Sequence, residues 1–179
     1  MSVAENLPVA LSYWKLPKSE LRIRTDVTPY GTGVFACDAI PAGTPLGEVR
    51  GTIIEGTDYQ SDYCMDLGED LSLEPDAPYR YVNHSCVPNC ELYQIDIEDE
   101  YGDVHPMIVI EATRDIAVDE QLTIDYAWPA EEAIPCGCAQ AKCRGYIVHP
   151  EELDLAVKLH GVLPQRTVAG DFAPTVLPK

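Results

Sequence analysis

The stretch RYVNHSCVPNC (residues 80–90) places an Asn, a His and two Cys within eight residues, at positions 83, 84, 86 and 90. It is too polar for an ordinary buried strand and has too little Gly and Ser for a linker. Polar and thiol groups gathered this closely are expected to serve binding or chemistry, so the rest of the chain is interpreted around this segment.

The bulk composition predicts one intracellular domain with its own core. The chain has 179 residues, 46% of them apolar, and no run of about 18 apolar residues that would cross a membrane. Its start carries no positively charged leader before an apolar stretch, so we expect a location in the cytoplasm or nucleus. Thiols stay reduced there, and the seven Cys therefore indicate metal binding or chemistry before disulfides.

The charge is strongly acidic, with a formal net charge of −18 at pH 7. Phosphate contacts need Lys and Arg, so direct binding to nucleic acid is not expected. A basic protein or peptide is the partner that this charge favours, although acidity that serves solubility alone explains it equally well.

The order of patterns along the chain predicts a mainly β protein. Residues 1–20 are interpreted as an irregular lead-in, and alternating or short apolar runs separated by Gly and Pro then predict many short strands. Residues 90–116 resemble a hairpin with Gly102 at its tip. Only residues 150–161 predict a helix, because Pro150 suits its first turn and Gly161 suits its end. Residues 162–179 are interpreted as a tail.

Three thiols in CGCAQAKCRG, Cys136, Cys138 and Cys143, predict a zinc site. A structural zinc ion needs a fourth ligand, and Cys86 and Cys90 are the candidates. Unrelated thiols or a disulfide are the alternatives. A hydrolase pair of His84 and Cys86 is disfavoured, because catalytic Cys and His usually come from distant sequence positions.

Four segments in this order resemble the SET-domain protein lysine methyltransferases with a post-SET zinc motif: YGTGVFA (30–36), RYVNHSCVPN (80–89), DEQLTIDY (119–126) and CGCAQAKCRG (136–145). The central segment is specific, whereas the Gly-x-Gly alone is weak. The chain departs from the family pattern at Asp119, where Gly is usual, and at Gln121, where an acid is common. Its insert before residue 80 is short.

The resemblance implies a fold of several small β-sheets around a knot-like crossing, which brings the two central segments side by side. It divides the chain into a lead-in (1–20), a SET domain (21–128), a post-SET zinc segment (129–148) and a C-terminal helix with tail (149–179).

The implied reaction is methyl transfer from S-adenosyl-L-methionine to a lysine of a basic, histone-like tail. The alternative is an inactive module that binds a basic peptide. An acidic side is expected to steer the substrate, formed by the hairpin tip and by Asp66, Glu69, Asp70, Glu74 and Asp76.

The resemblance also assigns roles to single residues. It implies cofactor binding by Gly31, Thr32, Gly33, Asn83, His84 and Tyr126. Tyr126 would also be the catalytic residue, and Arg80 a supporting salt-bridge residue. The substrate channel would contain Tyr63, Ile124 and Tyr146, while Trp128 fits the core equally well. The metal ligands would be Cys86, Cys136, Cys138 and Cys143, with Cys90 as the alternative to Cys86. Because Ile124 lacks the hydroxyl that limits some relatives to one methyl group, we expect di- or trimethyl product.

Overall fold

The computed structural model describes residues 22–56, 59, 61–68, 70–98, 101–102 and 104–162. The predicted lead-in, nearly all of the predicted tail, and Glu69 lie outside these residues. Among the described residues, no helix combines the length and the apolar character that a membrane crossing requires.

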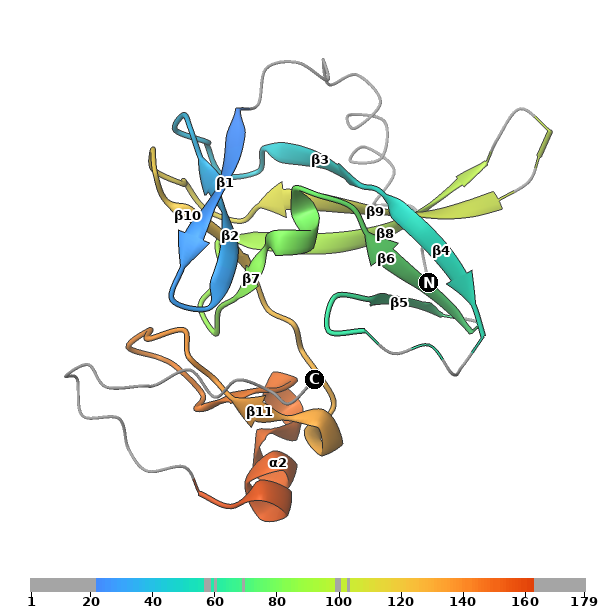
Figure 1. Ribbon diagram of the computed structural model, residues 1–179. Helices are drawn as coiled ribbons and strands as arrows, with labels where there is room; N and C mark the ends of the chain where they lie inside the picture. Colours follow the sequence, from blue (N-terminus) through green and yellow to red (C-terminus); the bar gives the residue numbers. More distant parts are fainter. Residues whose placement is uncertain are drawn as a thin grey trace, which may run out of the picture.

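The described part of the chain is mainly β, as predicted, and its strands form four small sheets (Figure 1). The first sheet has the order β1-β2-β10-β7, the second β3-β9-β8, the third β4-β6-β5 and the fourth β11-β12. The strand bounds are β1 Ile23–Thr28, β2 Gly31–Ala36, β3 Pro45–Val49, β4 Gly51–Glu55, β5 Met65–Gly68, β6 Leu71–Pro75, β7 Asn83–His84, β8 Cys90–Glu98, β9 Val104–Ala112, β10 Gln121–Ile124, β11 Ile134–Pro135 and β12 Tyr146–Ile147.

Helical structure is short. The 3₁₀ turns are η1 Tyr79–Tyr81, η2 Ala130–Glu132 and η3 Pro150–Glu152, and the last leads into α2 Leu153–His160. This confirms the helix predicted over 150–161. Pro150 stands in the first turn, and Gly161 ends the helix with a positive φ of 91° that favours glycine.

The main core is formed by side chains from the first three sheets. Val34 of β2, Ile110 of β9 and Leu122 of β10 are completely buried at its centre. Burial of apolar side chains from strands distant in the sequence holds the sheets together. Figure 1 shows that the long β8 and β9 strands extend beyond the other strands.

A second, smaller core lies below the sheets in Figure 1, where β11 and α2 are drawn. Its buried residues are Ala130, Ala133, Tyr146, Val148 and Ala156. The segment predicted to bind zinc and the C-terminal helix therefore share one core. The division of the chain at residue 148 stays a prediction.

The pairing of β7 with β10 brings the two central segments side by side, as the resemblance implied. These two strands are parallel, with Thr123 opposite Asn83 and Ile124 opposite His84. Ser85 then donates its N–H to the Ile124 carbonyl at 2.9 Å. The order β2-β10-β7 thus places the Gly-rich strand and both signature segments in one sheet.

The buried Asn89 side chain holds strand β10 in place through hydrogen bonds. Its side chain is 1% exposed and donates to the Gln121 carbonyl at 2.8 Å and to the Glu120 carboxylate at 3.0 Å. Its amide oxygen accepts from the Thr123 N–H at 2.8 Å. One side chain therefore satisfies both a main-chain carbonyl and a main-chain N–H of β10.

The backbone conformation at position 119 explains why Asp can stand where the family pattern has Gly. Its φ is 63°, in the left-handed region that glycine adopts without cost and where Asp is tolerated better than most residues. The carboxylate also pairs with Arg24 at 2.9 Å. The Asp therefore keeps the turn that the usual Gly makes.

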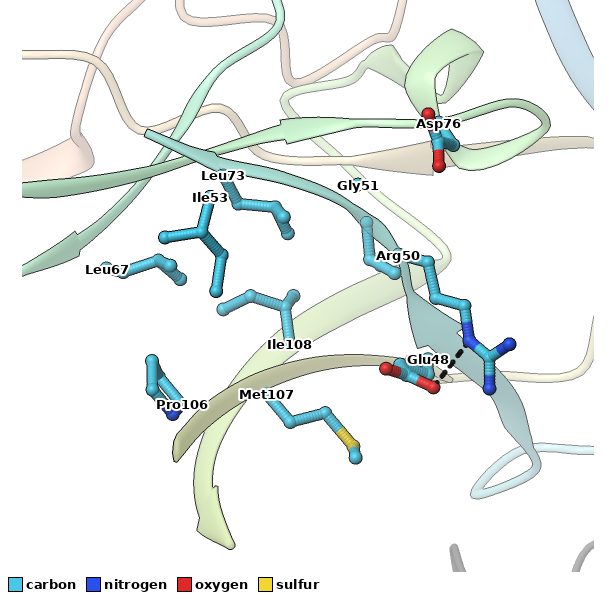
Figure 2. A pocket seen from close by; sticks show the side chains of 11 residues that line it. Glu48, Arg50, Gly51, Ile53, Leu67, Leu73, Asp76, Pro106, Met107 and Ile108 are labelled. Atoms are coloured by element: carbon cyan, nitrogen blue, oxygen red, sulfur yellow. Dashed lines mark hydrogen bonds and ion pairs between the residues drawn. The ribbon is translucent and has the colours of Figure 1, made fainter. Parts of the chain in front are cut away.

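A cleft of about 380 Å³ lies between the second and third sheets, where β3 continues into β4 at Arg50 (Figure 2). Ile53, Leu67 and Ile108 give it apolar walls, and Arg50 is paired with Glu48 at its rim. Asp76, one of the predicted steering acids, lines this cleft, but none of the residues to which the sequence assigns a cofactor, channel or metal role does.

We predict that Asn89→Ala strongly destabilises the protein. The substitution leaves a buried N–H and a buried carbonyl without partners, so the free energy of unfolding should fall by about 3 kcal/mol. Denaturant unfolding measures this loss. The matched control is Gln94→Ala, which removes one hydrogen bond from an exposed side chain to the Leu67 carbonyl and should cost less than about 1 kcal/mol. Equal losses in the two variants would contradict the structural role of Asn89.

Candidate active site

The two glycines of the Gly-rich turn have different surroundings: Gly33 is closely packed, and Gly31 faces open space. A Cβ at Gly33 would lie 2.6 Å from the Gln121 side chain and 2.7 Å from that of Thr28, so any other residue here would displace these side chains. Gly31 has a φ of 106°, and a Cβ placed there would meet no atom within 4 Å. The turn is thus closely packed at Gly33 and leaves room for a ligand beside Gly31.

Asn83 lies next to this turn. Its side-chain amide donates to the Thr32 carbonyl at 3.1 Å, which ties β7 to the Gly-rich strand. The structure therefore brings together the predicted cofactor residues Gly31, Thr32, Gly33 and Asn83.

His84 connects the Tyr126 main chain to the thiol cluster. Its ring is buried, and its Nδ1 lies 3.2 Å from the Tyr126 N–H and 3.5 Å from the Asp125 carboxylate. The N–H can only donate, so Nδ1 accepts and carries no proton, and the contact with Asp125 is not an ion pair. The neutral ring then has its proton on Nε2, 3.4 Å from the Cys86 sulfur.

Tyr126 is held at both its main chain and its hydroxyl. The hydroxyl donates to the Val82 carbonyl at 3.0 Å. Burial raises the pKa of this phenol to about 12, with a smaller contribution from Tyr63 nearby. The hydroxyl is therefore protonated and neutral around pH 7, so it can orient and donate but does not act as a base.

Aromatic rings surround Tyr126. The His84 ring is 5.4 Å away and the Trp128 ring 5.5 Å away, measured between ring centroids. Tyr63 is close enough to affect the Tyr126 pKa electrostatically, and the Arg80 guanidinium lies 3.9 Å over the Tyr63 ring. Neutral aromatic walls of this kind suit a lysine side chain and disfavour its water shell.

Arg80 is a salt-bridge residue, as predicted, because it pairs with Glu74. Glu74 also accepts a hydrogen bond from the Tyr59 hydroxyl at 3.0 Å. This acid is thus engaged within the protein, and Asp76 lines the cleft of Figure 2. Of the individually predicted steering acids among the described residues, Asp66, Asp70 and Asp76 are exposed.

The four predicted thiols meet at one point. The sulfur atoms of Cys86, Cys136, Cys138 and Cys143 all lie within 4.8 Å of one another. Cys86 is 3.6 Å from Cys136 and 3.9 Å from Cys143. Four sulfurs bound tetrahedrally to one zinc ion stand about 3.8 Å apart, so this donor set fits the metal.

The Cys136 thiol, His84 and the Arg144 N–H favour the thiolate form of Cys86, whereas burial opposes it. The pKa of this thiol is lowered to about 3, mainly by the hydrogen bond with Cys136, followed by His84 and the Arg144 N–H. The Cys136 thiol, which shares that bond, has its pKa raised instead. A bound cation would remove this asymmetry, because all metal-bound thiols are deprotonated.

Cys90 lies apart from this cluster. It is 1% exposed, begins β8 in the main core, and makes its sulfur contact with the Asn89 side chain at 3.5 Å. Burial raises the pKa of its thiol to about 12, so it stays protonated. The geometry therefore favours Cys86 over Cys90 as the fourth ligand.

The other two predicted channel residues are both buried. Ile124 packs in the main core and stands two residues before Tyr126. Tyr146 lies in the second core, where its hydroxyl donates to the Gly161 carbonyl at 2.9 Å. This placement favours a structural role for the Tyr146 side chain, whereas Ile124 remains next to the catalytic candidate in sequence.

Three residues near the site received no role from the sequence. Tyr30 donates its hydroxyl to the Gly137 carbonyl, and its ring fills the space that a side chain at position 137 would need. Arg144 pairs with Asp125 at 2.7 Å. Tyr30, Asp125 and Arg144 each belong to a quoted motif, but their contacts join different motifs, so no single motif predicts them.

Residues 31–127 match the SET domain family, which is more than half of the chain. The chain belongs to this family.

Curated relatives include histone-lysine methyltransferases. The chain is 34% identical over 161 residues to the histone-lysine N-methyltransferase trithorax of Drosophila virilis, which covers 79% of this chain and 4% of that protein. It is 46% identical over 69 residues to a histone-lysine N-methyltransferase, H3 lysine-4 specific, of Schizosaccharomyces pombe, covering 38% of this chain and 7% of that protein. The chain thus spans a small fraction of the length of the relatives it matches.

Solved structures support the fold. A crystal structure of KRYPTONITE in complex with mCHG DNA and SAH has a TM-score of 0.60 at 23% identity, covering 72% of this chain and 29% of that one. A second KRYPTONITE structure, with mCHH DNA, an H3(1–15) peptide and SAH, has a TM-score of 0.58 at 22% identity, covering 71% and 29%. At this identity the likeness concerns the fold. The expectation of no nucleic-acid binding by the present chain stays a prediction.

Proposed function

We propose that this chain is a protein-lysine N-methyltransferase that transfers methyl groups from S-adenosyl-L-methionine to a lysine in a basic, histone-like tail. The observation that carries the proposal is the position of the Tyr126 hydroxyl. It is partly buried and bonded to the Val82 carbonyl, directly before the Asn83–His84 strand, which Asn83 in turn ties to the Gly-rich strand. The names of the curated relatives support the same activity.

The cofactor fits the residues present. The space beside Gly31 and the adjacent polar groups of Thr32 and Asn83 could hold S-adenosyl-L-methionine. When bound, it supplies a methyl group that its sulfonium already makes electrophilic. The chain must then align the lysine amine with this methyl group and keep water out.

The lysine must arrive as a neutral amine, because an ammonium has no lone pair. Tyr126 does not remove its proton near pH 7, since the phenol pKa of about 12 leaves no appreciable phenolate to serve as a base. The apolar and aromatic surroundings of Tyr126 instead disfavour the charged form of the amine and lower its pKa. The Tyr126 hydroxyl then orients the reacting groups.

We predict that Tyr126→Phe lowers the turnover number at least about tenfold and leaves cofactor binding within about twofold. The ring remains, but its hydroxyl and the bond to the Val82 carbonyl are lost. Transfer of a radiolabelled methyl group to an H3(1–15) peptide measures turnover, and calorimetry measures cofactor affinity. The control is Tyr93→Phe, which removes an exposed hydroxyl that bonds Glu91.

Wild-type turnover in Tyr126→Phe would remove Tyr126 from the catalytic role. A wild-type protein that binds basic peptides but methylates none in a panel would instead support an inactive binding module.

We infer that zinc is held by the four clustered thiols. We predict about one zinc ion per purified chain, retained in Cys90→Ser and lost or strongly weakened in Cys86→Ser. The reason is that the Cys86 sulfur lies among the other three, whereas that of Cys90 is buried in the main core. Metal analysis after dialysis decides this, and the opposite pattern would assign the fourth ligand to Cys90.

We also predict di- or trimethyl product, because Ile124 offers no hydroxyl to hold the amine after its first methylation. Mass spectrometry of a peptide carried to completion should show these products for the wild type. Ile124→Tyr should shift them toward monomethyl.

Ile124→Phe is the control for this prediction, since it adds a ring without the hydroxyl. Both rings enter a packed core and should cost about 1–3 kcal/mol, so thermal unfolding must confirm that each variant is folded. Monomethyl product alone from the wild type would refute the prediction.

A further inference from the structure

Arg144 is a partly buried cation that the proposed reaction does not use. Its side chain is 14% exposed, and its Nη2 donates to the Asp125 carboxylate at 2.7 Å. Arg144 directly follows the thiol of Cys143, and Asp125 directly precedes Tyr126. The ion pair therefore joins the thiol cluster to the segment that carries the catalytic candidate.

Asp125 fixes the main chain on the far side of Tyr126. The same carboxylate oxygen accepts the Ala127 N–H at 3.2 Å, and Ala127 adopts a φ of 48° in the left-handed region. A non-glycine residue holds this conformation only when its surroundings impose it. The carboxylate, itself oriented by Arg144, is the group in a position to do so.

His84 provides a second connection between the thiol cluster and the main chain of Tyr126. Its Nδ1 accepts the Tyr126 N–H, and its Nε2 faces the Cys86 sulfur. The Arg144 N–H also points at that sulfur, at 3.4 Å. The main chain around Tyr126 is thus tied on both sides to residues of the thiol cluster.

We propose that the Arg144–Asp125 ion pair is a positioning element, which transmits the order of the metal-bound thiol cluster to Tyr126. The inference rests on the proposed function. In this arrangement Arg144 touches neither cofactor nor substrate and acts only through Asp125. Losing the pair should leave the metal bound but allow the Tyr126 ring to move from its place beside Val82.

The test compares Arg144→Met and Asp125→Asn with the zinc-loaded wild type. Each variant should keep one zinc ion, lose about tenfold in kcat on the H3(1–15) peptide, and change KM by less than about twofold. The double variant should lose no more than either single one, because both remove the same interaction. Arg144→Lys keeps the charge and should recover most of the activity.

The matched control is Arg22→Met, which breaks an exposed pair with Asp38 at 2.6 Å and should change nothing. Asp125→Asn decides the matter if Arg144→Met folds poorly. Unchanged kcat in a zinc-loaded variant, or losses that add up in the double variant, would overturn the proposal.

A measurement without turnover separates this inference from the proposed function. In ¹³C-tyrosine-labelled protein, the Tyr126 resonance, assigned with Tyr126→Phe, should shift when zinc is removed from the wild type. In zinc-loaded Arg144→Met it should already be displaced. An unshifted resonance in that variant would refute the positioning role. A wild type that transfers no methyl group would refute the proposed function alone.

Discussion

The parallel contact between β7 and β10 is the constraint on which the site depends. Two strands of two and four residues make few main-chain hydrogen bonds, and parallel neighbours cannot be joined by a tight turn. The Asn89 side chain supplies what the short ladder lacks, because it bonds donors and acceptors of β10 from within the core. Without this contact, His84 would not lie under Tyr126, and Cys86 would not reach the thiols that follow.

The fold could be predicted largely from the sequence, because its decisive segments carry local signals. Alternating or short apolar runs predicted many of the strands, Pro150 and Gly161 bounded the helix, and the four quoted segments indicated which segments come together. A motif alone does not explain its exceptions, as the left-handed backbone at Asp119 shows. The family pattern has Gly there, and the structure explains why Asp can replace it.

The site was less predictable, because several of its properties depend on which way a side chain faces. Cys86 and Cys90 are only four residues apart in the sequence. Cys90 begins strand β8, and its side chain enters the main core, whereas Cys86 precedes this strand. The spacing of the cysteines in the sequence therefore could not decide which of the two is the fourth zinc ligand. Tyr146 likewise follows the thiol motif closely, yet β12 directs its ring under α2. The partners Arg144 and Asp125 belong to different motifs, and neither motif predicts their contact.

The second core is so small that metal binding by the thiol cluster would be needed to stabilise it. Its buried set comprises three Ala, one Val and one Tyr, which remove little apolar surface from water, and its helix α2 has eight residues. Isolated helices of this length are marginal in water, and cores this small need a further stabilising interaction. A metal ion held by four thiols would supply it, since its binding free energy becomes folding free energy. Three of those thiols belong to this segment, whereas Cys86 belongs to the signature. The same ion that ordered the segment would therefore also fix it against His84 and Tyr126.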